Sequence, residues 1–134
     1  MRKLAHSLGC LIVSLIWVEP SAAQTLNVTR SAESGVDSFI GWERGWDRNC
    51  NTVPVTVTIT TNPANGTISV VPEVASTIPE STPAGGSTGA CAGKSVTGNQ
   101  VRYKSNAGFH GTDSVSYNVS IQPQRPRVIT INVK

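Results

Sequence analysis

The stretch VRYKSNAGFHGTDSVSYNV, residues 101–119, carries the clearest structural pattern in this sequence. Beyond its glycine-containing turn, apolar residues occupy every second position: Val115, Tyr117, Val119 and Ile121. Polar residues stand between them, so one side of the segment is apolar and the other is polar. A period of two is typical of a strand that buries one face and exposes the other. We therefore predict a half-buried strand over residues 114–121.

The turn before this strand contains residues with distinct physical roles. Gly108 and Gly111 can adopt positive φ without steric cost, as a sharp reversal requires. Asp113 has a short carboxylate that we expect to accept backbone N–H groups of its own turn. Phe109 is expected to pack into the core, and His110 to be an exposed corner residue. The segment therefore predicts both a chain reversal and the buried face of the strand.

Further short strands are expected at residues 26–28, 53–61, 67–71, 100–104 and 127–133. The Asn-Gly pair in the turn at residues 62–66 favours a hairpin. Residues 31–52 are predicted to form a long connection, the least predictable part of the chain, and residues 72–89 an irregular excursion. After residue 23, no stretch keeps the 3.6-residue period of a helix over three turns. Short strands joined by Gly, Pro and Asn turns predict an all-β fold, an Ig-like antiparallel β-sandwich of about seven strands.

The N-terminal residues have the pattern of a signal peptide. Basic residues Arg2 and Lys3 precede an apolar run at residues 8–18, and the small residues Ser21-Ala22-Ala23 follow it. The run is shorter than the roughly 20 apolar residues that span a bilayer. We predict a signal peptide at residues 1–23 and one domain at residues 24–134. This domain would be periplasmic or secreted, with no stable membrane insertion after signal cleavage.

Two cysteines, Cys50 and Cys91, follow the predicted cleavage site. Their spacing does not match a metal-binding motif, and export would place them in an oxidising compartment. We predict a disulfide bond between them. Two free thiols are the alternative.

Residue types that carry catalysis or bind metals are sparse after residue 23. His110, Asp113 and Ser114 lie within one turn, whereas a nucleophile, a base and an orienting acid usually come from separate elements. One histidine and two cysteines are too few ligands for zinc, and the acidic residues are too dispersed for calcium. We expect no enzyme activity, no catalytic residues, no cofactor and no metal site.

The charge of the chain is modest. Lys and Arg number 11 against 8 Asp and Glu, which gives a formal net charge of +3. The basic residues are scattered, and no aromatic residues alternate with them as a binder of single-stranded nucleic acid requires. We expect no nucleic-acid partner.

The chain from residue 62 to residue 117 contains several motifs that specify turns or fill a core. They are the turn Asn62-Pro63-Ala64-Asn65-Gly66-Thr67, Tyr103, the run Gly108-Phe109-His110-Gly111-Thr112-Asp113-Ser114, and Tyr117. Together they resemble the bacterial immunoglobulin-like and cadherin-like repeats of secreted and surface proteins. Val115 stands where that family usually has Phe, and this chain has one unit where the family has tandem repeats. The resemblance implies an Ig-like sandwich with an extracytoplasmic binding or structural role.

The candidate binding residues are Phe39, Trp42, Arg44 and Trp46, which lie close together in the sequence. Exposed indole rings can stack on sugar rings or anchor a protein partner, with Arg44 supplying polar contacts. The alternative is that one or both tryptophans fold under the loop and close the end of the sandwich. Either arrangement fits the sequence.

The expected function is that of an exported, non-catalytic Ig-like domain acting as a protein-interaction or structural module of the cell envelope. Its partner would be an envelope protein or a glycan. The alternative is a carbohydrate-binding module that uses Trp42 and Trp46.

Overall fold

The structure, a computed structural model, describes residues 24–82, 87–121 and 125–134. The signal peptide predicted for residues 1–23 lies outside the described residues. The described part of the chain contains strands and one short 3-10 helix. In order they are β1 (Leu26–Ala32), β2 (Asp37–Glu43), β3 (Gly45–Trp46), β4 (Thr52–Val53), β5 (Val57–Thr61), β6 (Gly66–Thr77), η1 (Gly89–Cys91), β7 (Ser95–Ser105), β8 (Gly111–Val119) and β9 (Arg127–Val133).

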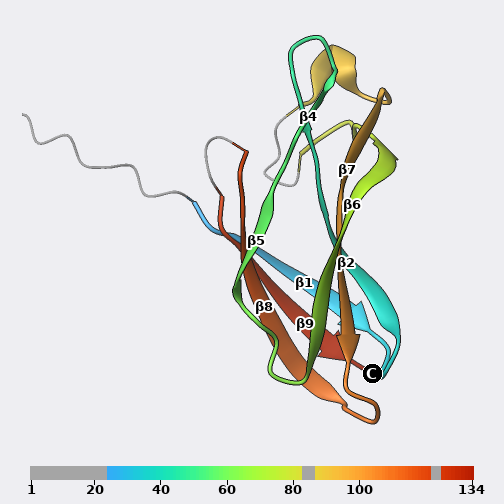
Figure 1. Ribbon diagram of the computed structural model, residues 1–134, viewed down its shortest axis with the longest axis vertical. Helices are drawn as coiled ribbons and strands as arrows, with labels where there is room; N and C mark the ends of the chain where they lie inside the picture. The colour runs from blue at the N-terminus through green and yellow to red at the C-terminus, as the bar shows by residue number, and fades with distance from the viewer. Residues whose placement is uncertain (1–23, 83–86, 122–124) are drawn as a thin grey trace, which may run out of the picture.

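Most of the strands form two sheets that pack as a sandwich (Figure 1). One sheet has the order β1-β9-β8-β5 and the other the order β2-β7-β6, while β3 and β4 pair separately. The series β9-β8-β5 and β2-β7-β6 follow the strand order of the two sheets of an immunoglobulin-like sandwich. The predicted all-β, Ig-like sandwich is confirmed.

The pairing of β1 differs from the predicted antiparallel arrangement. β1 lies parallel to β9, from Leu26 opposite Arg127 to Ala32 opposite Val133. Short connections make neighbouring strands antiparallel, but β1 and β9 are the first and last strands and no short connection joins them. The prediction of purely antiparallel pairing was therefore wrong for this pair.

The core lies between the two sheets. Its buried residues are Ala32, Ile40, Val101, Tyr103, Val115, Tyr117, Val119, Ile129, Ile131 and Val133. The predicted alternation on β8 is confirmed at positions 115, 117 and 119. Ile121 lies beyond the end of β8 and is 37% exposed, so its expected place on the buried face was wrong. Phe109 packs against the core but stays half-buried.

The turn at residues 62–66 joins the two sheets and does not close a hairpin. β5 pairs with β8 in one sheet, and β6 pairs with β7 in the other. Asp113 on β8 stabilises this crossing, since its buried carboxylate accepts N–H bonds from Ala64 and Asn65, both at 2.9 Å. The predicted hairpin was wrong. Asp113 does accept a local N–H bond, from Ser114 at 2.9 Å, but its other two backbone bonds reach the 62–66 turn, which was not predicted.

Strands occupy parts of both segments that were predicted to be connections: β2 and β3 lie within residues 31–52, and β6 continues to Thr77. β2 has a bulge between Phe39 and Gly41, so Ile40 and Gly41 are both buried and the alternation of a strand is lost. β6 continues through Pro72 because it is an edge strand, where the missing N–H costs no ladder bond. Pro72 and Glu73 both lie in a bulge between Val71 and Val74, where Glu73 adopts a φ of 56°. Conversely, the strand predicted at residues 53–61 is interrupted between β4 and β5.

Asp113 makes the fold sensitive to acid. Burial alone would raise the pKa of Asp113, but backbone N–H bonds from Ala64, Asn65 and Ser114 and the Tyr103 hydroxyl outweigh burial and lower this pKa. A carboxyl group whose folded pKa is lowered binds protons more readily in the unfolded chain. The stability from Asp113 is therefore present above the ordinary aspartate pKa of about 4, and it is lost as the pH falls through the lower folded value.

We expect Asp113→Asn to lower the free energy of unfolding by about 1–3 kcal/mol at neutral pH, because an amide cannot accept all of these bonds. The variant should also lose the acid dependence that Asp113 supplies. Denaturant unfolding of both proteins between about pH 7 and about pH 2 measures the two effects. Identical unfolding curves over this range would contradict the role of Asp113, and Ser114→Ala, at an exposed neighbour, is the control.

Candidate functional site

Phe39 and Trp42 lie on the outer face of the three-stranded sheet, meaning the solvent side of β2, β7 and β6. Phe39 pairs with Arg102 of β7, and Trp42 pairs with Gln100. Val101 stands between these two β7 residues and is fully buried, so Arg102 and Gln100 point away from the core. Paired residues of neighbouring strands share a face. Phe39 and Trp42 therefore lie on the same outer surface.

The two aromatic rings are in contact. Their centroids are 6.2 Å apart and their planes stand at 89°. The β2 bulge explains why residues three positions apart share a face, since its extra residue shifts the alternation by one. Phe39 is 45% exposed, and Trp42 is half-buried. Val71 of β6 pairs with Gln100 and adds a second exposed apolar side chain to this face.

Arg44 follows β2 and crosses the outer face beside Trp42. Its guanidinium carbon lies 5.7 Å from the Trp42 ring centroid, within the range of a cation–π contact. Its Nη1 donates to Oγ of Ser76 on β6 at 2.6 Å. Burial lowers the pKa of Arg44, and the neighbouring Glu43 charge offsets part of this effect. The guanidinium is thus half-buried and held by both strands that flank β7.

Gly98 of β7 makes room for the Arg44 side chain. A Cβ added at position 98 would lie 2.8 Å from the Arg44 Cβ and 2.8 Å from the Glu43 carbonyl oxygen. Neither distance is compatible with an ordinary contact between such atoms. Arg44 can lie across the sheet only because this position has no side chain.

Arg102 is the second arginine of the outer face, and its donors are already engaged. Its Nε forms an ion pair with Asp37 at 2.8 Å, and its Nη2 donates to the Asp37 carbonyl oxygen at 3.1 Å. Its Nη1 donates to Gln100 Oε1 at 3.3 Å. Arg102 therefore has a charge partner within the chain.

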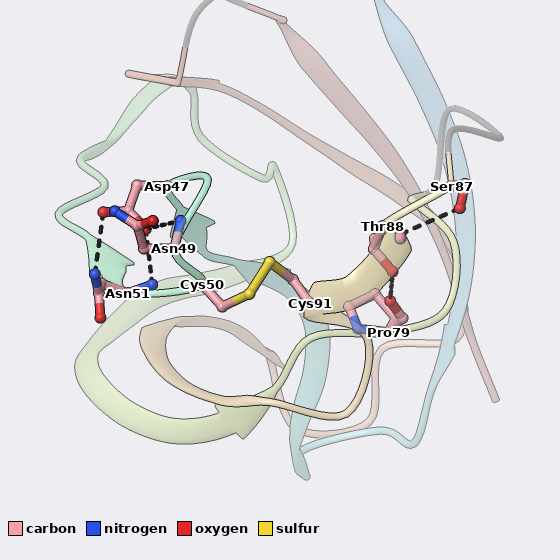
Figure 2. The surroundings of a disulfide bond; sticks show 9 residues. Asp47, Asn49, Cys50, Asn51, Pro79, Ser87, Thr88 and Cys91 are labelled. Carbon is pink, nitrogen blue, oxygen red and sulfur yellow. Dashed lines mark hydrogen bonds between the residues drawn. A yellow bond between two sulfur atoms is a disulfide. The ribbon is translucent and has the colours of Figure 1, made fainter.

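Trp46 lies in a second, smaller hydrophobic cluster. It is half-buried against Ile78, Cys91 and Val96. Cys50 and Cys91 form the predicted disulfide, which joins the loop after β3 to η1 (Figure 2). Trp42 contacts Phe39 and Arg44 instead. Both tryptophans are partly covered, but by different groups.

Asp47 shapes the loop that carries Cys50 (Figure 2). Its Oδ1 accepts the N–H groups of Asn49 at 2.8 Å and Asn51 at 2.9 Å. The hydrogen bond from the backbone N–H of Asn51 is the main cause of the lowered pKa of Asp47. Cys50 adopts a φ of 65°, which is uncommon for a residue with a side chain. This turn, which sequence analysis missed, presents Cys50 to Cys91.

A buried charged cluster behind Arg44 was also missed. Glu43 is 5% exposed and accepts a hydrogen bond from the Tyr117 hydroxyl at 2.8 Å. Its other carboxylate oxygen forms an ion pair with Arg127 Nη2 at 3.2 Å. Tyr117 and Arg127 belong to the opposite sheet, so these contacts tie the two sheets together behind the outer face. In the sequence Glu43 is one of several dispersed acids, and no local pattern marks it as buried.

The residues considered for catalysis have other surroundings. His110 and Ser114 are exposed, whereas the buried Asp113 carboxylate binds the N–H groups of Ala64 and Asn65. Within the described residues, no three His, Cys, Asp or Glu side chains gather in a way that could hold a metal ion. No helix in residues 24–82, 87–121 or 125–134 is long and apolar enough to cross a membrane.

The motifs that resemble Ig-like repeats have structural roles in this fold. Tyr103 and Tyr117 are buried in the core, and Asp113 holds the connection between the sheets. These residues support the architecture and do not form the outer face. Comparison of the chain with known protein families, curated proteins and solved structures finds no match.

Proposed function

We propose that this chain is an exported, non-catalytic Ig-like module that binds a protein of the cell envelope through its outer face. The observation that carries the proposal is the group formed by Phe39, Trp42 and Arg44, in which Trp42 contacts both of the others outside the buried core. Aromatic residues and arginine are enriched at the centres of protein interfaces. Exposed Val71 on the same face extends the apolar surface available to a partner.

A protein partner suits this face better than a sugar. A sugar ring stacks on a flat, open aromatic face, but here the Phe39 and Trp42 rings stand at 89° and Arg44 lies over Trp42. Trp46 packs against the disulfide cluster. A carbohydrate-binding module that uses Trp42 and Trp46 is therefore the weaker alternative, and the experiment below includes it as an outcome.

The Cys50–Cys91 disulfide indicates an oxidising, extracytoplasmic location. The signal-peptide pattern at residues 1–23 agrees with export. A periplasmic or secreted location, and kinship with bacterial Ig-like and cadherin-like repeats, are parts of the proposal. Their support is the strand order of the two sheets and the motifs of residues 62–117.

A photo-reactive residue at position 39 tests the proposal. Replacing Phe39 by benzoylphenylalanine keeps an aromatic ring on the outer face, and irradiation of the native cell envelope should give a discrete protein adduct. The matched control is the same substitution at Asn132, an exposed β9 residue of the other sheet, which should give none. Equal adducts from both positions, or none from position 39, would contradict the proposal. An adduct to glycan would favour the carbohydrate alternative.

A further inference from the structure

We propose that Arg44 anchors a carboxylate of the protein partner, which presents an Asp or Glu side chain next to an apolar one. This inference rests on the proposed function and specifies the chemistry of the partner. Its basis is the position of a half-buried guanidinium, without an ion pair among the described residues, between the half-buried Trp42 ring and the β6 edge of the outer face.

Arg44 is held in position before any partner binds. The Trp42 ring, the Ser76 hydroxyl and the gap above Gly98 together define the path of its side chain. A free arginine side chain carries about 2 kcal/mol of rotamer entropy. A side chain that is already ordered loses less of this entropy on binding, so its contacts with a partner contribute more to affinity.

In the part of the chain that the structure describes, Arg44 has no counter-charge in direct contact. Among the described residues there are two ion pairs, Arg102 with Asp37 and Arg127 with Glu43. Within the same residues, Arg44 donates through Nη1 to Ser76, and its Nε and Nη2 have no hydrogen-bond partner. Neither nitrogen is among the buried side-chain atoms without a partner, so both are open to solvent and can donate to an acceptor of a binding partner. A carboxylate matches the planar donor fork of arginine and would supply the missing acceptors.

The neighbours of Arg44 define the rest of the partner segment. Phe39 and Val71 are 45% and 40% exposed, and both lie on the face that Arg44 crosses. An apolar side chain of the partner can cover them. Arg102 is paired with Asp37, and the exposed Lys104 lies opposite Asp37 at the other end of β2, so Arg44 is the cation of this face that contacts Trp42. These features together fit an extended acidic segment with an adjacent aromatic or aliphatic residue.

NMR titration of the isotope-labelled protein with two blocked tetrapeptides tests the inference. Acetylated and amidated Gly-Phe-Glu-Gly and Gly-Phe-Gln-Gly differ by a single charge. The Glu peptide should shift the resonances of the Arg44 Nε–H and the Trp42 indole N–H. It should bind at least about tenfold more tightly than the Gln peptide, because charge-assisted hydrogen bonds are about twice as strong as neutral ones. Equal binding of the two peptides to the unsubstituted protein would overturn the inference.

Substitutions of the two outer-face arginines show whether the preference for the Glu peptide depends on Arg44. Arg44→Gln should remove the preference for the Glu peptide, while Arg102→Gln, whose charge is already paired, should keep it. Arg44→Lys keeps the charge without the planar fork and should weaken Glu-peptide binding. Equal losses in Arg44→Gln and Arg102→Gln would mean general attraction to positive charge and would overturn the inference.

The two proposals can fail separately. If position 39 cross-links a protein but the two peptides bind equally, the proposed function stands and the role of Arg44 is rejected. If the Glu peptide is preferred but position 39 gives no protein adduct, the protein-partner function is rejected. A third experiment titrates the protein with tetragalacturonate, a glycan that carries carboxylates, and compares its affinity with that of the Glu peptide. Tighter binding of this glycan than of the Glu peptide would overturn the choice of a protein segment.

Discussion

Glu43→Ala is expected to lower the free energy of unfolding by about 3–5 kcal/mol, the usual cost of removing one partner of a buried ion pair. Glu43 is 5% exposed and accepts hydrogen bonds from Tyr117 and Arg127. Alanine would leave the Arg127 side chain, itself only 14% exposed, without its acceptor. The Tyr117 hydroxyl would also lose its partner inside the sandwich.

The matched control is a triple variant, Glu43→Leu with Tyr117→Phe and Arg127→Met. It replaces the whole polar cluster by apolar side chains of similar size, and such replacements are often neutral or stabilising. The triple variant should therefore be clearly more stable than Glu43→Ala. Chemical denaturation of both variants and the unsubstituted protein measures the difference. A loss below about 1 kcal/mol in Glu43→Ala would show that the cluster contributes little.

Tyr117 provides an independent readout of the same cluster. Burial is the main cause that raises the pKa of Tyr117 far above its ordinary value, and the Glu43 charge adds to it. In folded Glu43→Ala the charge effect is gone while much of the burial remains. The pKa of Tyr117 should therefore fall partway toward its ordinary value. An alkaline absorbance titration of the tyrosinate band follows this change.

Loss of the Cys50–Cys91 disulfide is expected to lower the free energy of unfolding by about 4 kcal/mol, the loop-closure entropy of a bridge of this span. The bridge connects residues separated by 41 positions, so its removal gives the unfolded chain much more freedom. The Trp46 cluster that it ties down is separate from the main core. This end of the molecule should therefore loosen before the main core unfolds.

Trp46 fluorescence detects the local step. In a Trp42→Phe background without residues 1–23, Trp46 is the remaining tryptophan. In the Cys50→Ser, Cys91→Ser variant, the Trp46 emission should move to longer wavelength at a lower denaturant concentration than the one at which the circular dichroism signal changes. Reduction of the disulfide in the same background is the control and should give the same loss. If the Trp46 fluorescence transition had the same denaturant midpoint in the oxidised and the reduced protein, the stabilising role of the disulfide would be contradicted.

Glu43 and Arg44 are adjacent in the chain but serve different sides of the sheet. Glu43 points into the sandwich, whereas Arg44 crosses the outer face. Substitution of Glu43 should therefore change stability, and substitution of Arg44 should change binding with a smaller effect on stability. This opposite orientation lets the two kinds of experiment be interpreted separately.

Much of the sandwich was predictable because its evidence is local. The alternation of apolar and polar residues in β8 predicted the buried positions 115, 117 and 119, because successive side chains of a strand point to opposite faces of the sheet. The disulfide followed from two cysteines and an export pattern. The candidate residues Phe39, Trp42 and Arg44 were found because they are close in sequence, and they do lie in contact.

Other features depend on partners that are distant in the chain. The 62–66 turn has hairpin chemistry, but Asp113 binds its backbone from another strand and the chain crosses to the second sheet. β2 was missed because its bulge breaks the alternation that identifies a strand. Edge position, which allows β6 to contain Pro72, is a property of the assembled sheet.

By itself, the sequence determined an all-β sandwich, the buried face of β8 and the pair of cysteines, because period, turn chemistry and residue type are local properties. Only the tertiary structure decided that Glu43 is buried and that Arg44 lies over Gly98 with no charge partner among the residues that the structure describes. Burial and charge pairing depend on residues of other strands, and no short stretch of sequence contains that information.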